Sequence, residues 1–170
     1  MLKDLPQYDC LLKAAERYPE LDPSANEAFL NLLRTGDLVF EVINHFLTQN
    51  NISQGRFTVM MLLRRHWVEN CTPASLAEEA GVTRATMTGL LDTLEKDGMI
   101  VRQADTQDRR TLHVHLTDQG SACLDSILPG HFQGVSRVMS PLTHSERKEL
   151  VRLLQKIQEQ LTPEPPKATR

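Results

Sequence analysis

The sequence predicts a mainly α-helical fold with one small β-hairpin (α+β), and three observations lead to this prediction. Apolar residues recur at helical spacing along most of the chain. Between residues 99 and 116 the apolar spacing changes to a period of two on both sides of a polar loop, the pattern of a β-hairpin. Residues that favour helix N-caps precede most of the helical segments. The chain is therefore expected to be a series of helices interrupted once by a hairpin.

The composition is that of a globular protein. The 170 residues are enough to bury a good core, and contents of 40% hydrophobic and 24% charged residues are ordinary. The net charge of −3 does not by itself indicate a nucleic-acid partner. Even residues 83–111 are balanced in charge, with five Lys/Arg and five Asp/Glu. Any positive surface must come from the placement of Arg84, Arg109 and Arg110, and from doubling in a dimer.

The cellular setting follows from two further patterns. No apolar run approaches the roughly 18 residues of a membrane span, and the N-terminus lacks the apolar segment of a signal peptide. Cys10, Cys71 and Cys123 are odd in number and widely spaced, which fits a reducing compartment better than a disulfide framework. We therefore expect a cytoplasmic protein with no membrane partner.

Residues 1–52 are predicted to form an N-terminal extension and a long dimerisation helix. A short amphipathic helix should end at Pro19, and a helix of this length needs a surface to cover. Ser24 and Glu27 form a candidate capping box for a helix running to about residue 48. The apolar residues of this helix are too many for one neighbouring helix to cover, so we expect a dimer interface here.

Residues 53–116 are predicted to contain three helices and the hairpin. The first helix is apolar nearly all round and should be central. Thr72 is expected to cap the second helix, and Gly81 to end it in the left-handed conformation. Thr83 is expected to cap the third. Two helices joined this tightly must cross steeply, and Ala77 and Gly81 are small enough for the crossing point.

The hairpin should pair strands over residues 99–103 and 112–116. Its loop, residues 104–111, carries arginines at the tip. Such a tip has little structural use, but the negative potential of a DNA minor groove attracts arginine. The helices and the hairpin together predict a winged helix-turn-helix.

Residues 117–161 are predicted to form C-terminal dimerisation helices, followed by a disordered tail over residues 162–170. Thr117 should cap the first of these helices, and Pro129 should break or kink it. Thr143 begins a capping box for the last helix.

These segments resemble the winged-helix core of the MarR family of transcriptional regulators. The resemblance rests on LAEEAGVTRATMTGLLDTLEKDGMI (76–100), DTQDRRT (105–111) and LTDQG (116–120), and extends loosely over about residues 25–160. It implies a homodimeric repressor that binds double-stranded DNA at a palindromic operator and responds to a small aromatic or phenolic effector. It implies no cofactor.

Candidate DNA-contacting residues lie on the third helix. Arg84, Thr86 and Thr88 lie off its apolar stripe, where the first turns of a recognition helix meet base edges in the major groove. Arginine can pair with guanine, and threonine can contact a base with its hydroxyl or its methyl group. Thr83, at the helix start, suits a phosphate.

The hairpin loop supplies the second group of candidates. The resemblance implies that Arg110 enters the minor groove and that Asp108 orients it. Arg109 is expected to contact the DNA backbone, and Thr111 a phosphate. The resemblance also implies an effector site, for which Phe57, Met61 and Trp67 are the candidate lining residues.

Other interpretations compete with these. Arg64, at a helix end, is expected to be solvated. The near-neutral charge also fits a winged helix used for protein contact. The family resemblance implies a redox switch as an alternative, through an N-terminal cysteine such as Cys10, although a packed or idle thiol is the simpler interpretation. His113 and His115 share one face of a strand, a spacing that can serve a metal, but no further ligand motif completes a site. No catalytic motif is present, so we do not expect an enzyme.

Overall fold

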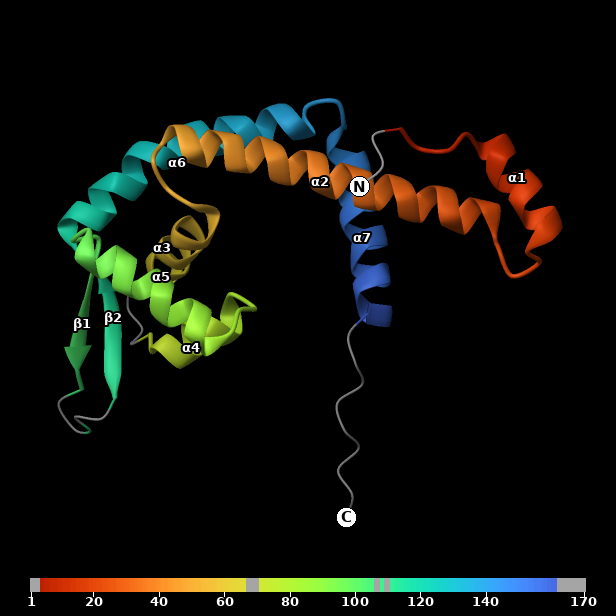
Figure 1. The fold of residues 1–170 in the computed structure, drawn as a ribbon. Coiled ribbons are helices and arrows are strands. Elements are labelled where there is room, and N and C mark those ends of the chain that lie inside the picture. Colours follow the sequence, from red (N-terminus) through yellow and green to blue (C-terminus); the bar gives the residue numbers. More distant parts are fainter. Residues whose placement is uncertain (1–3, 67–70, 106–107, 109–110, 162–170) are drawn as a thin grey trace, which may run out of the picture. The chain divides into compact units, whose positions relative to one another are not determined.

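The computed structural model describes residues 4–66, 71–105, 108 and 111–161 (Figure 1). The elements in chain order are α1(Tyr8–Arg17), α2(Pro23–Gln49), α3(Gln54–Arg65), α4(Pro73–Glu79), α5(Arg84–Lys96), β1(Ile100–Ala104), β2(Leu112–Leu116), α6(Asp118–Met139) and α7(His144–Leu161). The predicted fold class, mainly α with one small hairpin, is confirmed. The chain divides into two compact units, residues 1–129 and 130–170, and each is described by itself.

Helices α1 and α2 begin the first unit. α1 packs along the N-terminal part of α2, where Leu11 is buried (Figure 1). The N-cap of α2 is Asp22, whose Oδ1 accepts hydrogen bonds from the backbone N–H groups of Ser24 (2.9 Å) and Ala25 (3.1 Å). The predicted cap at Ser24 is therefore wrong by two residues. Asp22 takes the role because Pro23, which needs no N–H partner, fits the first helical position.

Most of α2 is not covered by the described part of the chain. In this 27-residue helix the only buried residue is Leu47, near the C-terminal end. The exposed large apolar residues of α2 are Phe29, Leu32, Leu33, Leu38, Phe40 and Val42. Phe29, Leu33 and Phe40 recur at intervals of four and seven residues and therefore lie on one side of the helix, where exposed apolar side chains favour a partner surface.

The core of the first unit lies among α3, α4, α5, the hairpin and the start of α6. Its fully buried side chains include Val59, Met60, Leu76, Met87, Leu91, Leu94, Val114 and Leu124. α3 and α5 approach closely at Gly55, where an added Cβ would lie 3.0 Å from a methyl carbon of Leu90. Helix α5 is therefore held in place by its packing against α3 and the shared core.

The hairpin is antiparallel, with Ile100 opposite Leu116 and Ala104 opposite Leu112. The first strand starts at residue 100 rather than at the predicted 99. Met99 is not part of the strand because its N–H donates to the carbonyl of Leu94 (2.9 Å). This hydrogen bond belongs to the turn that ends α5, in which Gly98 has the left-handed conformation (φ 71°).

The motif LTDQG joins this closing turn to α6. Thr117 donates through Oγ1 to the carbonyl of Gly98 (2.6 Å) and through its N–H to the carbonyl of Met99 (3.1 Å). It also caps α6, as predicted, by accepting the N–H of Gly120 (3.0 Å). A Cβ at Gly120 would lie 2.0 Å from the carbonyl oxygen of Met99. Glycine is therefore required at this position for space.

Helix α6 runs through Pro129, so of the two predicted outcomes the break is excluded, and the kink stays a prediction. Proline removes one backbone donor, and a helix of 22 residues retains its other hydrogen bonds on both sides. In the second unit the predicted cap of α7 is confirmed, since Thr143 Oγ1 accepts the N–H of Glu146 (3.3 Å) and Glu146 accepts the N–H of Thr143 (2.7 Å). No residue of α7 is buried.

Within the described ranges, no helix is both apolar and long enough to cross a membrane. The predicted tail, residues 162–170, and three predicted site residues, Trp67, Arg109 and Arg110, lie outside the described residues.

Candidate nucleic-acid interface

Helices α4 and α5 form the predicted helix-turn-helix. Thr72 and Ser75 cap α4 reciprocally, with Thr72 Oγ1 accepting the N–H of Ser75 at 3.1 Å. Gly81 has a φ of 65°, the left-handed conformation that the turn needs. An added Cβ at Gly81 would have no atom within 4 Å, so its predicted role as a small residue at the crossing is wrong. Ala77, the other small residue predicted there, is buried.

The N-terminal end of α5 carries the predicted recognition residues on its outer side. Met87, Leu91 and Leu94 face the core, while Thr83, Arg84, Thr86 and Thr88 are all exposed. This division confirms the sequence-based assignment of the two faces.

The hydroxyl groups of these threonines have local partners. Thr83 Oγ1 accepts the N–H of Thr86 (3.1 Å) and lies 2.9 Å from the Thr86 hydroxyl. Thr88 donates to the carbonyl of Arg84 (2.9 Å). The methyl groups and remaining lone pairs of the threonines are left for an outside partner, whereas no group among the described residues pairs with the Arg84 guanidinium.

Acidic side chains along the rest of α5 lie beside arginines of neighbouring elements. Arg102 of β1 lies 2.7 Å from Asp92 and 3.2 Å from Glu95, and Arg56 of α3 pairs with Asp97. The N-terminus of α5 has the positive end of the helix dipole in addition to Arg84. The charges of α5 are therefore unevenly placed, with Arg84 and the positive end of the dipole at its N-terminus and the carboxylates farther along the helix.

The loop between the strands is organised around Asp105. The carbonyl of Thr111 accepts the N–H of Asp105 (2.9 Å), and Asp105 Oδ1 accepts the N–H of Asp108 (2.8 Å). The other carboxylate oxygen, Oδ2, lies 2.8 Å from Nε2 of His113. Thr111 closes the loop by donating its N–H to the carbonyl of Asp108 (2.9 Å). The role of Asp108 toward Arg110 stays a prediction.

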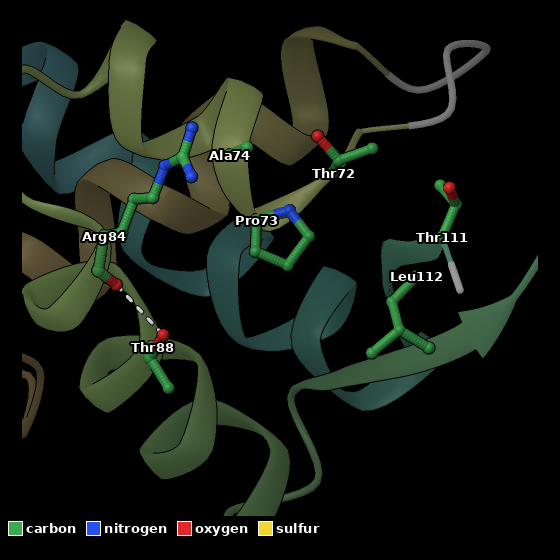
Figure 2. Close-up of a pocket in the computed structure, with 7 residues that line it drawn as sticks. All are labelled: Thr72, Pro73, Ala74, Arg84, Thr88, Thr111 and Leu112. Atoms are coloured by element: carbon green, nitrogen blue, oxygen red, sulfur yellow. Dashed lines mark hydrogen bonds between the residues drawn. The ribbon is translucent and has the colours of Figure 1, made fainter.

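A pocket of about 430 Å³ lies between α5 and the base of the hairpin loop (Figure 2). Arg84 extends from α5 toward the start of α4, and the hairpin borders the opposite side. The lining residues are Thr72, Pro73, Ala74, Arg84, Thr88, Thr111 and Leu112. Two predicted contact regions, the start of α5 and Thr111, therefore share one concave surface.

The structure does not gather the predicted effector-site residues around this pocket. Phe57 is buried in the core and Met61 is half-buried against it, so both are held by packing. Their role, like that of Trp67, stays a prediction.

Arginines at three positions have structural roles that the sequence did not reveal. Arg64 donates to Ser121 Oγ (2.6 Å) and pairs with Asp125, so the prediction of a solvated helix end is wrong. Arg56 and Arg102 hold α5 against α3 and β1. The partners of Arg56 and Arg64 lie 41 to 61 residues away in the chain, beyond any local pattern. Arg102 could have been recognised from the sequence. It lies two residues after Ile100 in the first strand, so both side chains are expected on the same, inner face of the hairpin.

Comparisons with known proteins agree with this geometry. The family model described as MarR family matches residues 52–112, which cover α3, the helix-turn-helix, the first strand and the hairpin loop. The HTH-type transcriptional repressor YetL of Bacillus subtilis (strain 168) is 36% identical over 161 residues, covering 95% of this chain and 96% of YetL.

Solved structures share the fold. The transcriptional repressor CouR, in a structure with a 23-mer DNA duplex, has a TM-score of 0.67 and 27% identity, covering 75% of this chain and 89% of CouR. BpsR of Bordetella bronchiseptica, described with regulation of its DNA binding by 6-hydroxynicotinic acid, has a TM-score of 0.67 at 22% identity, covering 78% of this chain and 98% of BpsR.

The relationship to YetL extends over nearly the whole of both chains, and the family model falls on the elements that form the exposed helix-turn-helix. The protein therefore belongs to the MarR family and is a DNA-binding transcriptional regulator with a winged helix-turn-helix, not an enzyme.

Proposed function

We propose that the protein is a homodimeric, cytoplasmic repressor that binds a palindromic operator. Each protomer places the start of α5 in a major groove and the loop of residues 105–111 in the adjacent minor groove. The observation that carries this proposal is the exposed Arg84, which no described residue neutralises, at the N-terminus of a helix whose acidic groups are already paired. Phosphate and guanine are the partners such a group favours.

The contacts on the DNA divide by chemistry. Arg84 is the candidate for guanine, with Thr86 and Thr88 beside it for base edges or a thymine methyl group. Thr83 and Thr111 are candidates for phosphates, which set the register but do not read sequence. Arg110 enters the minor groove with Asp108 orienting it, and Arg109 contacts the backbone.

The dimer would bury the apolar surfaces that the chain leaves exposed. These surfaces lie on α2, and in the second unit on Phe132, Val135 and Val138 of α6 and Val151, Leu153 and Ile157 of α7. In this organisation residues 1–52 and 117–161 dimerise and residues 53–116 bind DNA. Two copies of α5 then meet half-sites about 35 Å apart, one helical turn of the duplex.

Selection of bound duplexes from a random pool tests this function directly. We expect an enriched site with twofold symmetry, and binding that weakens steeply as salt increases because phosphate contacts release counterions. An absence of binding to every duplex at low ionic strength would contradict the proposal and would favour a winged helix used for protein contact.

Control by a small aromatic or phenolic effector is the second part of the proposal, supported by what is described for BpsR. An effector acts only through a difference in affinity for the DNA-competent and DNA-incompetent arrangements of the dimer. Titration of aromatic carboxylates and phenols into the protein–operator complex tests this part. If no compound of either class changes operator affinity, this part of the proposal is wrong.

A further inference from the structure

We propose that His113 and Asp105 form a positioning pair that holds the hairpin loop in the conformation in which it engages DNA. This inference rests on the proposed function, because it names the residues through which the loop arginines are placed. Neither residue was among the sequence-based candidates for DNA contact.

The two side chains meet diagonally across the hairpin. His113 lies opposite Gln103 in the register, and Asp105 follows β1 two residues after Gln103, on the same face. Their contact joins Nε2 of His113 to Oδ2 of Asp105 at 2.8 Å. Because an ionised carboxylate only accepts hydrogen bonds, the imidazole must carry its proton on Nε2.

The same carboxylate also binds the backbone of the loop. Oδ1 of Asp105 accepts the N–H of Asp108, and the Asp108 carbonyl accepts the N–H of Thr111. Asp108 and Thr111 are the residues that precede Arg109 and follow Arg110 in the chain. His113 therefore orients the group that sets the backbone on both sides of the two arginines.

The pair is sheltered from water, and its burial has a cost. The side chain of His113 is 14% exposed and that of Asp105 is 25% exposed. The other ring nitrogen, Nδ1 of His113, is buried and has no hydrogen-bond partner among the described residues. Leaving Nδ1 unpaired costs free energy, and the hydrogen bond from Nε2 to the Asp105 carboxylate offsets this cost. The histidine at this position therefore connects the second strand to the carboxylate that holds the loop backbone.

The test compares three variants of the full-length protein on the selected operator duplex. His113→Leu removes the donor, whereas His113→Gln keeps an N–H near the position of Nε2. His115→Leu is the matched control, because His115 lies on the same strand and face and has no hydrogen bond to Asp105. We expect His113→Leu to weaken operator binding about tenfold, the effect of losing a hydrogen bond to a charged group, while the other two variants bind like the wild type.

A double-mutant cycle with Arg110→Ala separates positioning from a general effect on folding. In the Arg110→Ala background, His113→Leu should cost much less affinity, since the loop then has no arginine for the minor groove and only the backbone contact of Arg109 is left to position. An equal loss in both backgrounds, or wild-type binding by His113→Leu, would overturn the positioning role while leaving the proposed function intact. If Arg110→Ala itself binds like the wild type, the predicted minor-groove contact fails, and the positioning role fails with it.

Discussion

Replacing Gly120 with alanine perturbs the junction at which α6 begins against the turn after α5. The added Cβ would lie 2.0 Å from the carbonyl oxygen of Met99, and both groups belong to backbone that cannot turn aside. To relieve the clash the first turn of α6 must move away from Met99. That movement breaks or lengthens the hydrogen bonds that Thr117 makes with Gly98 and Met99.

The expected cost follows from these contacts. Two hydrogen bonds contribute about 1 kcal/mol each, and overpacking adds about 1–3 kcal/mol, so Gly120→Ala should lose roughly 3 kcal/mol or more of unfolding free energy. For a chain of this size each kcal/mol lowers Tm by roughly 2–4 °C, which predicts a decrease of about 6–12 °C.

Thermal melting without DNA, at one fixed protein concentration, measures this effect, because the stability of a dimer depends on its concentration. Gly89→Ala is the control. Gly89 lies inside α5, and its added Cβ would have no atom within 4 Å, so alanine should stabilise the helix by about 0.5–1 kcal/mol. If Gly120→Ala melts within about 2 °C of the wild type, the steric argument for this glycine is wrong.

Three further predictions concern the DNA face and one helix cap. Arg84→Ala should relax the sequence preference at one position of each half-site, costing about 1–3 kcal/mol if the contact is bidentate; an unchanged selection profile would assign Arg84 to the backbone alone. Arg110→Ala should weaken operator binding without unfolding the protein and reduce the salt dependence by about one counterion; titrations at several salt concentrations would expose an unchanged slope. Hydrogen bonds from the Ala25 N–H and from Ser24 lower the pKa of Asp22 below its usual 3.8, so its capping contribution is present above that pH and is lost as the pH falls through the lowered pKa. Asp22→Asn should therefore differ most in Tm from the wild type at neutral pH and converge with it in acid, and a constant difference from pH 2 to pH 7 would contradict this cause.

Local sequence patterns predicted most of the fold. Thr72, Thr83 and Thr143 each cap a helix through a contact three residues away, and such contacts are visible in the sequence. The division of α5 into a buried and an exposed face followed from periodicity alone. The one misplaced cap arose because Asp22 and Ser24 are both good capping residues, and Pro23 between them decided the choice.

Contacts between distant segments could not be predicted in the same way. Arg64 was expected to be solvated because its partners on α6 are separated from it by 57 and 61 residues. Gly120 belongs to a motif noted in the sequence, but its reason, the approach of the Met99 carbonyl, exists only once α6 is packed. The contact between His113 and Asp105 required the register of the hairpin, which depends on where β1 begins.

The junction around Thr117 also limits how the regulator can respond to a signal. The turn that follows α5 and the first turn of α6 share two hydrogen bonds and one position with no room for a side chain. We therefore expect α5 to move together with the beginning of α6 as one rigid body. If the proposed effector acts by displacing α6, it would change where the helix lies on the duplex and leave the internal shape of the helix intact.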